Sequence, residues 1–194
     1  QIRQKIEGFA EEDVFYGDTY ADSVANISKQ VSGDSSSAAD LICYTHKRIA
    51  DMRAHLLGVE VIHMGATYEV KLVRVRLKKA ILNQCTPFLE ELDQNSVKLR
   101  FFIDDNHEVE IDKNMFSLAM YNFFSNAAKY TKFESEIRLH YSDEKKSLDI
   151  SMISLKMEKS EINHLFQEGV RGKHAKDVAG KGIGLFVLQN ALKV

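Results

Sequence analysis

The chain has 194 residues, 44% of them apolar, and a formal net charge of −2. This composition excludes a wholly disordered chain, and the near-neutral charge argues against nucleic acid as a partner. No apolar run approaches the roughly 18 residues of a membrane span, so we expect membrane attachment only through segments outside this sequence. Two cysteines are too few for a disulfide scaffold or a four-ligand zinc site, and they favour a cytoplasmic location. Because the sequence begins at Gln1, we expect a fragment of a longer protein, such as the cytoplasmic part of a membrane receptor.

The first 69 residues are predicted to be helical. Apolar residues recur at helical spacing over residues 1–9 and 21–31, and a serine-rich break follows at 32–37. Residues 41–62 then carry an apolar stripe with a period of about 3.5 residues, which predicts a long amphipathic helix. Such a stripe suits a helical hairpin or a dimeric bundle, and it equally suits a helix that packs on its own domain.

From residue 70 onward the pattern predicts a mixture of helices and strands. A helix over 77–92 contains Pro87, which should kink it or start a new segment at Thr86. Asp112 is a suitable N-cap for a helix over 113–130. The other expected elements are strands over 97–103, 108–111, 136–141 and 147–153, helices over 160–166 and 183–192, and a loop over 167–181. This order predicts an α+β fold, a two-layer α/β sandwich with helices on one face of a mixed sheet.

One face of the predicted helix over 113–130 carries polar side chains. Asn122, Asn126, Lys129 and Tyr130 stand at positions i, i+4, i+7 and i+8, which share a helix face. Carboxamide oxygens suit Mg²⁺, and a lysine can meet a phosphate as a point charge. The alternative is a polar face wetted by solvent, but asparagine is a poor helix former, so two of them at this spacing favour a binding role.

A glycine-rich stretch opens the last predicted helix. Gly180, Gly182 and Gly184 lead into Leu185, and Lys181 stands among them. Glycines let the backbone approach a phosphate, and a helix start offers free N–H groups, although glycines also end or begin helices for structural reasons. The preceding loop is basic, with Arg171 the first of its cations, which strengthens the phosphate interpretation.

These two stretches resemble a known family. Residues 122–131 resemble the N box of sensor histidine kinases, of the form NxxxNAxKYT, and the glycine stretch resembles the G2 box. Phe166 with residues 169–172 is similar to the F box and the start of the ATP lid. The resemblance runs from about residue 70 to the end and includes the superfamily shared with gyrase, MutL and a heat-shock chaperone.

The resemblance implies a fold, a reaction and partners. It implies a Bergerat-type ATP-binding sandwich over 70–194, preceded by a helical dimerisation or histidine-phosphotransfer-like segment over 1–69. ATP and Mg²⁺ would be the cofactors, the chain would pair as a homodimer through its first helices, and a response-regulator receiver domain would accept the phosphoryl group. The metal would be held by Asn126 and Asn122. The nucleotide would be held by Asn122, Asn126, Lys129, Tyr130, Arg171, Gly180, Lys181, Gly182, Gly184 and Leu185.

Asn122 bears on the type of reaction. The hydrolysing branches of the superfamily resemble one another in placing a glutamate at this position, as a general base for water. Asparagine cannot take a proton, which favours transfer of the γ-phosphate to another acceptor.

The sequence also departs from the family pattern. At the aspartate and the two glycines of the G1 box it has Met152, Ser154 and Lys156, and Asp149 is the nearest carboxylate. The family's acceptor histidine aligns with Ala50, so the acceptor is lost here, is carried by a different helix, or is one of the candidate phosphoacceptors His46 and His55, which could equally be ordinary histidines of a helix surface.

Three functions therefore stand as hypotheses. The first is an ATP-dependent protein histidine kinase of a two-component system. The second is the same fold with a disabled nucleotide site, acting as a phosphotransfer or docking scaffold. The third is a serine kinase like the anti-sigma factors, which the long helical N-terminal part disfavours.

Overall fold

The computed structural model describes residues 2–10, 19–64, 68–156, 158–170 and 182–192. The chain divides into two compact units, Gln1–Met52 and Arg53–Val194. The division falls inside one long helix, and the functional division expected between residues 69 and 70 stays a prediction.

The first unit is helical. It contains α1 (Ile2–Phe9), α2 (Tyr20–Gly33) and the first part of α3 (Ser35–Met64). A small apolar cluster forms its interior, made of Phe9, Ala10 and Ala38 with Leu41 against them.

The break between α2 and α3 is shorter than the predicted turn at 32–37. Asp34 alone separates the two helices, and its Oδ1 accepts a hydrogen bond from the Ser37 N–H at 3.0 Å. This cap satisfies a free donor of the first turn, so the serines of residues 35–37 begin α3.

The second unit contains two sheets rather than the single expected sheet. In the first, β1 (Leu72–Arg76) pairs antiparallel with β3 (Glu108–Asp112). In the second, β4 (Glu136–Ser142) pairs parallel with β2 (Lys98–Phe102) and antiparallel with β5 (Ser147–Met152).

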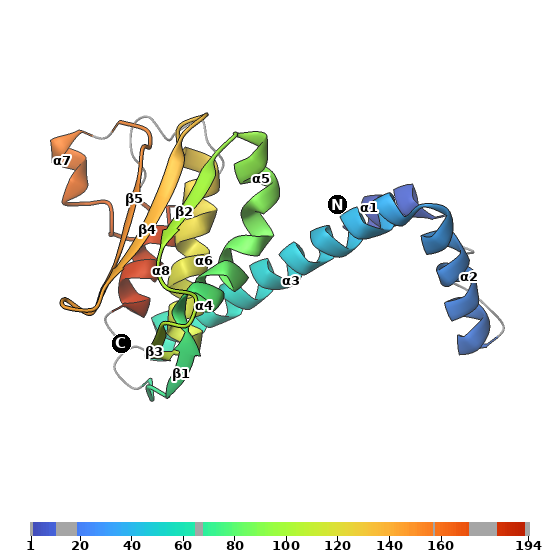
Figure 1. Ribbon diagram of the computed structural model, residues 1–194, viewed down its shortest axis with the longest axis horizontal. Coiled ribbons are helices and arrows are strands. Elements are labelled where there is room, and N and C mark those ends of the chain that lie inside the picture. Colours follow the sequence, from blue (N-terminus) through green and yellow to red (C-terminus); the bar gives the residue numbers. More distant parts are fainter. Residues whose placement is uncertain (1, 11–18, 65–67, 157, 171–181, 193–194) are drawn as a thin grey trace. The chain divides into compact units, whose positions relative to one another are not determined.

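The helices of this unit are α4 (Leu77–Cys85), the 3₁₀ turn η3 (Thr86–Phe88), α5 (Leu89–Gln94), α6 (Lys113–Tyr130), α7 (Lys159–Ile162) and α8 (Gly184–Ala191). The fresh start expected at Thr86 is confirmed, because Pro87 ends the regular helix and forces the 3₁₀ turn. Figure 1 shows α4, α5 and α6 on one side of the three-stranded sheet. The main core lies between these layers and includes Ile81, Phe124, Ile137 and Leu139, all fully buried. The predicted α+β two-layer architecture is therefore confirmed.

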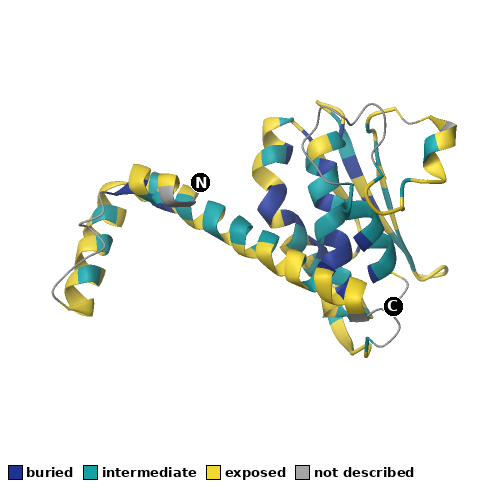
Figure 2. Cartoon of the chain, turned by 180° about the vertical axis from the view of Figure 1, so that it is seen from behind, coloured by how far each residue is buried: buried dark blue, intermediate teal, exposed yellow. Residues whose placement is uncertain are grey.

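A second core joins α6 and α8 to the end of α3. Val61 from α3, Leu118 from α6 and Val187 from α8 are among its buried members. Gly58 lies in the same layer, where an added Cβ would stand 3.6 Å from a Val187 methyl group, so glycine lets the two helices approach closely. Figure 2 shows exposed residues along much of α3 and buried residues gathered in the helices of the second unit. Within the described ranges, no helix is both long and apolar enough to cross a bilayer.

Candidate functional site

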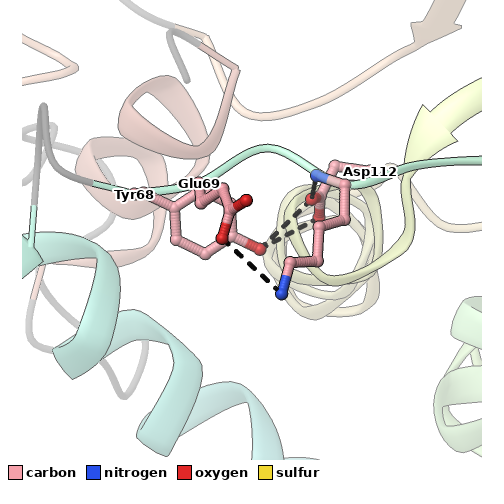
Figure 3. A network of polar contacts seen from close by, with 4 residues as sticks. Tyr68, Glu69 and Asp112 are labelled. Carbon is pink, nitrogen blue, oxygen red and sulfur yellow. Dashed lines mark hydrogen bonds and ion pairs between the residues drawn. The ribbon is translucent and has the colours of Figure 1, made fainter.

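The start of α6 is fixed by Asp112, as the sequence predicts. Its Oδ1 accepts hydrogen bonds from the N–H groups of Asn114 and Met115, both at 3.0 Å. Two donors reach it from the segment before β1. The N–H of Lys71 lies 2.8 Å from Oδ2, and the Tyr68 hydroxyl lies 3.2 Å from each oxygen. Figure 3 shows Tyr68 and Asp112 turned toward one another, with Glu69 beside them. The N-terminal end of α6, ten residues before Asn122, is thereby held by a junction of five residues.

The charge of Asp112 is stabilised by this junction. Burial alone would raise the pKa of Asp112, but the hydrogen bonds that its carboxylate accepts outweigh burial and hold the pKa below its ordinary 3.8. The pKa of Tyr68 is raised, first by burial and then by the negative charge of Asp112. The pair therefore prefers a charged carboxylate with a neutral phenol.

The two asparagines of α6 lie one turn apart in different states of hydrogen bonding. Asn122 Nδ2 donates to the Leu118 carbonyl at 2.9 Å, which fixes the amide and leaves Oδ1 toward α8. Asn126 Nδ2 is buried and has no acceptor among the described residues. A buried amide without a partner is costly, so this atom marks a place where a ligand would complete the hydrogen bonding.

Gly184 lies directly against both carboxamides. A Cβ added to Gly184 would stand 3.4 Å from Asn122 Oδ1, 3.4 Å from Asn126 Nδ2 and 3.5 Å from Asn126 Oδ1. Gly184 is the first residue of α8, whose N-cap Ile183 makes no side-chain hydrogen bond to the helix. Free N–H groups of a helix start and two carboxamides therefore share one small space, which suits an anion with its cation.

Gly182 explains a second part of the glycine motif. Its φ is +72°, and an added Cβ would stand 2.7 Å from the Val170 carbonyl oxygen. Its own carbonyl accepts a hydrogen bond from the Gly169 N–H at 3.2 Å. No side chain fits at Gly182, so the backbones of two segments meet there.

The C-terminal end of α6 leads to β5. Thr131 follows the helix, is 9% exposed, and donates from Oγ1 to the Met152 sulfur at 3.3 Å. A bridge between Thr131 and Ser154 continues the contact between the backbones. Tyr130 is half-buried, and Lys129 is exposed.

The remaining predicted site residues are placed as follows. Leu185 is half-buried in the first turn of α8, whereas Arg171, Gly180 and Lys181 lie outside the described residues. His46 and His55 are exposed on α3. The two histidines are nine residues apart, which at about 100° per residue puts them on opposite faces of the helix.

Sequence reasoning missed two members of the site. Tyr68 lies far from Asp112 in sequence, and its only signal was its place just before the first strand. Thr131 was expected only as the end of a motif, and its contact with Met152 joins residues 21 positions apart.

The residues next to Gly184 fit the phosphates of a nucleoside triphosphate together with Mg²⁺. Among the described residues, no three His, Cys, Asp or Glu side chains gather closely enough to hold a metal ion. A cation here would therefore depend on carboxamide oxygens together with phosphate oxygens, whereas the unpaired Nδ2 of Asn126 is a donor and suits a phosphate oxygen.

Comparisons with known proteins show what the sequence and the fold are similar to. No protein-family model matches the chain. The chain is 27% identical over 137 residues to the adaptive-response sensory kinase SasA of Synechococcus sp. (strain JA-3-3Ab), a match that covers 66% of this chain and 36% of that protein's length. The catalytic domain of histidine kinase ThkA superposes with a TM-score of 0.53 at 16% identity, over 64% of this chain and 81% of that chain.

A longer solved structure covers both units. Full-length ShkA, crystallised in complex with AMPPNP, superposes with a TM-score of 0.54 at 13% identity, over 96% of this chain and 37% of that chain. The architecture, a helical N-terminal part followed by an α+β domain, therefore resembles that of histidine kinase catalytic domains. Sequence and fold together support a histidine kinase type of ATP-binding domain.

Proposed function

We propose that the chain is the catalytic part of a cytoplasmic sensor histidine kinase, which binds ATP with Mg²⁺ and passes the γ-phosphate to a histidine and then to a response regulator. The observation that carries this proposal is the contact of Gly184 with the carboxamides of Asn122 and Asn126. It brings metal-binding oxygens and phosphate-binding amides to one point.

Each residue of the site would have one role. Asn126 would hold Mg²⁺ with Asn122 beside it, and the metal would neutralise charge on the phosphates. The N–H groups at Gly184 and Leu185 would bind phosphate oxygens, and Lys129 would add a positive charge. Tyr130 would line the nucleoside, and the Arg171, Gly180 and Lys181 roles expected from the sequence remain part of the proposal.

The absence of a base at Asn122 favours transfer over hydrolysis. A carboxamide cannot accept a proton from water, so the site does not activate water for attack. In the transfer step, an imidazole nitrogen of the acceptor attacks the γ-phosphorus, the bond from that phosphorus to the bridging oxygen breaks, and ADP leaves. An aspartate of the response regulator then takes the phosphoryl group from the histidine.

His46 and His55 are the candidate acceptors within this chain. Both are exposed and lie on opposite faces of α3, so a single docking geometry would select one of them. His46→Gln and His55→Gln, made singly, should show acid-labile phosphate lost in one variant and kept in the other.

Homodimerisation through α3 is also part of the proposal. On one side of this helix, Ala54, Leu57 and Val61 pack in the second core. Met52 and Leu56 are exposed on the opposite side. The two uses that the sequence left open, packing on its own domain and pairing with a partner, therefore involve different faces. An exposed apolar stripe of this length favours a second copy as partner.

Isothermal titration with AMPPNP and Mg²⁺ tests nucleotide binding. We expect micromolar affinity in the wild-type chain and at least a tenfold loss in Asn126→Ala, with Asn163→Ala, at the end of α7, as a matched control that keeps full affinity. Absence of binding at millimolar nucleotide would contradict the kinase and favour the scaffold. That second function is supported by Met152 at the position of the G1 aspartate, and by Asp149 on the outer face of β5.

A further inference from the structure

Strand β2 forms one edge of the three-stranded sheet (Figure 1). The N–H of Lys98 donates to the Ser135 carbonyl on the β4 side at 3.0 Å. Backbone groups of successive residues in a strand point to opposite edges, so the N–H and C=O of Leu99 and Phe101 point away from β4. In the part of the chain that the structure describes, no strand pairs with this outer edge. It therefore offers free backbone donors and acceptors to an added strand.

An open groove lies beside this edge, between α5 and the start of β2. Its volume is about 490 Å³, and it is lined by Leu89, Glu90, Leu92, Asp93, Val97 and Leu99. This volume falls in the range of about 300–1,000 Å³ that is typical of ligand sites. Leu89 is 45% exposed, so no described residue covers this apolar wall. A peptide strand paired with β2 would direct every second side chain toward the groove.

The charges around the groove indicate the chemistry of its occupant. Glu90 and Asp93 are exposed on the α5 side, and neither forms an ion pair with another described residue. On the other face of β2, Lys98 and Arg100 are exposed. A strand that carries apolar and basic residues toward the groove and acidic residues toward the open face would complement both sets of charges.

The same charges disfavour a second copy of the chain as the occupant. If two β2 strands paired antiparallel about Leu99, Lys98 of each copy would stand opposite Arg100 of the other. Like charges directly opposite one another destabilise a sheet, and cations on an edge strand prevent self-pairing in this way. The edge therefore suits a different sequence better than its own.

We propose that the outer edge of β2 and the groove beside it bind an extended segment of a partner protein, with apolar and basic residues toward the groove and acidic residues toward Lys98 and Arg100. The segment adds a strand to the sheet, so backbone hydrogen bonds supply affinity and the groove supplies specificity. This surface shares no residue with the candidate nucleotide site. The inference is therefore independent of the proposed function, and its test needs no nucleotide.

Fluorescence anisotropy of the full chain with a labelled synthetic peptide tests the proposal. The probe is Lys-Glu-Leu-Glu-Leu-Glu-Lys, which places lysines and leucines on one side of a strand and glutamates on the other. We expect a dissociation constant of about 100 µM or below. A peptide of the same composition in the order Leu-Leu-Lys-Lys-Glu-Glu-Glu, which lacks the alternation, should bind at least about tenfold more weakly. Equal affinity for the two peptides would contradict the proposal.

Methylation of the probe backbone tests strand pairing without any change in the protein. Alternate residues of a strand direct their N–H groups to opposite edges, so only one alternate set of the probe can donate to β2. N-methylation of the leucines and of the glutamates, in separate peptides, should abolish binding in one case and leave the affinity within about threefold in the other. Equal responses to the two modifications would overturn strand addition.

Asp93→Lys tests the position of the groove. Asp93 is exposed near the C-terminal end of α5, where a cation suits the helix, so the variant should fold. It should weaken binding of the probe at least about fivefold, whereas Glu144→Lys, the same charge change in the exposed turn after β4, should bind as wild type. Equal binding by both variants would overturn the assignment to this groove. Absence of probe binding at millimolar peptide, together with an oligomer that Asp93→Lys disrupts, would assign the edge to a second copy and overturn the proposal.

Discussion

The α-carbon of Gly184 faces the carboxamide of Asn126, so closely that a methyl group there would stand 3.4 Å from Nδ2. One residue comes from the start of α8 and the other from the middle of α6, and these helices pack along one another. The contact links the glycine motif to the asparagine motif across 58 residues of sequence. A side chain at this position would lie directly against both carboxamides.

Gly184→Ala should therefore lose nucleotide affinity while the fold stays intact. The new methyl group would lie in van der Waals contact with Asn122 and Asn126, where it would take room from a ligand held by these amides, and we expect AMPPNP affinity to fall about fivefold or more. The free energy of unfolding should change by less than about 1 kcal/mol, because the methyl group meets no clash and alanine favours the helix. Calorimetry and urea unfolding measure the two effects. Gly8→Ala, where an added Cβ meets nothing within 4 Å, is the control and should bind normally.

A comparison of Gly182 with Gly169 separates the effect of backbone strain from the effect of a close contact with a neighbouring segment. Both have positive φ, +72° and +75°, but only at Gly182 would an added Cβ collide, at 2.7 Å from the Val170 carbonyl oxygen. Gly169→Ala should lower the free energy of unfolding by about 1 kcal/mol through backbone strain alone, and Gly182→Ala should lower it clearly more. Limited proteolysis with urea unfolding would measure the difference. Equal effects in both variants would show that the close approach does not matter.

The junction at Asp112 predicts a pH-dependent stability. The folded pKa of Asp112 lies below 3.8, so its contribution is complete above the unfolded pKa and is lost as pH falls through the folded value. Asp112→Asn keeps a capping side chain but loses the charge, so the free energy of unfolding at pH 7 should fall by about 1 kcal/mol. The stability difference between wild type and this variant should shrink as pH is lowered from about 5 to 3. A difference that stays constant over this range would contradict a charged junction.

Tyr68→Phe tests the link from the segment before β1. Removal of the hydroxyl leaves Asp112 with its backbone donors. The free energy of unfolding, measured with urea at pH 7, should therefore fall by only about 0.5–1.5 kcal/mol. Because this hydroxyl helps to hold the pKa of Asp112 low, Tyr68→Phe should bring the folded pKa closer to the unfolded one and should therefore lose less stability than wild type as pH falls from about 5 to 3. Tyr20→Phe, at an exposed site in α2, provides the control.

The two cysteines give a probe of unfolding. Cys85 is completely buried in the main core, and burial raises its pKa to about 11, whereas Cys43 is exposed. At pH 8 only about one in a thousand Cys85 thiols would be ionised, so a thiol reagent should label Cys43 first and Cys85 only through opening of the core. Saturating AMPPNP with Mg²⁺ should slow Cys85 labelling, since a ligand that binds the folded state stabilises it. Equal labelling rates for both cysteines would contradict the packing.

Local signals in the sequence predicted most helices and strands. Contacts between segments that are distant in the sequence could not be predicted from it. The helix over 113–130 was predicted with both bounds correct because Asp112 caps it and its pattern ends at Tyr130. The strand Leu72–Arg76 was missed, although valine and arginine alternate within it, because it is short and mostly exposed. The approach of Gly182 to Val170 and the Thr131–Met152 hydrogen bond depend on how the chain returns in space. No periodicity encodes such contacts, which is why they emerged only from the structure.

The exposed stripe of α3 predicts the oligomeric state. Ile49, Met52, Leu56 and Val59 stand 50–71% exposed on one side of the helix, opposite Ala54 and Val61, which face the second core. Spacings of three and four residues between them match the seam of a coiled coil. Leu56→Glu places a charge in that seam, so sedimentation equilibrium should show a dimer in wild type and a monomer in the variant. Val24→Glu, at an exposed apolar position of α2, should remain a dimer, and a monomeric wild-type chain at micromolar concentration would refute pairing through α3.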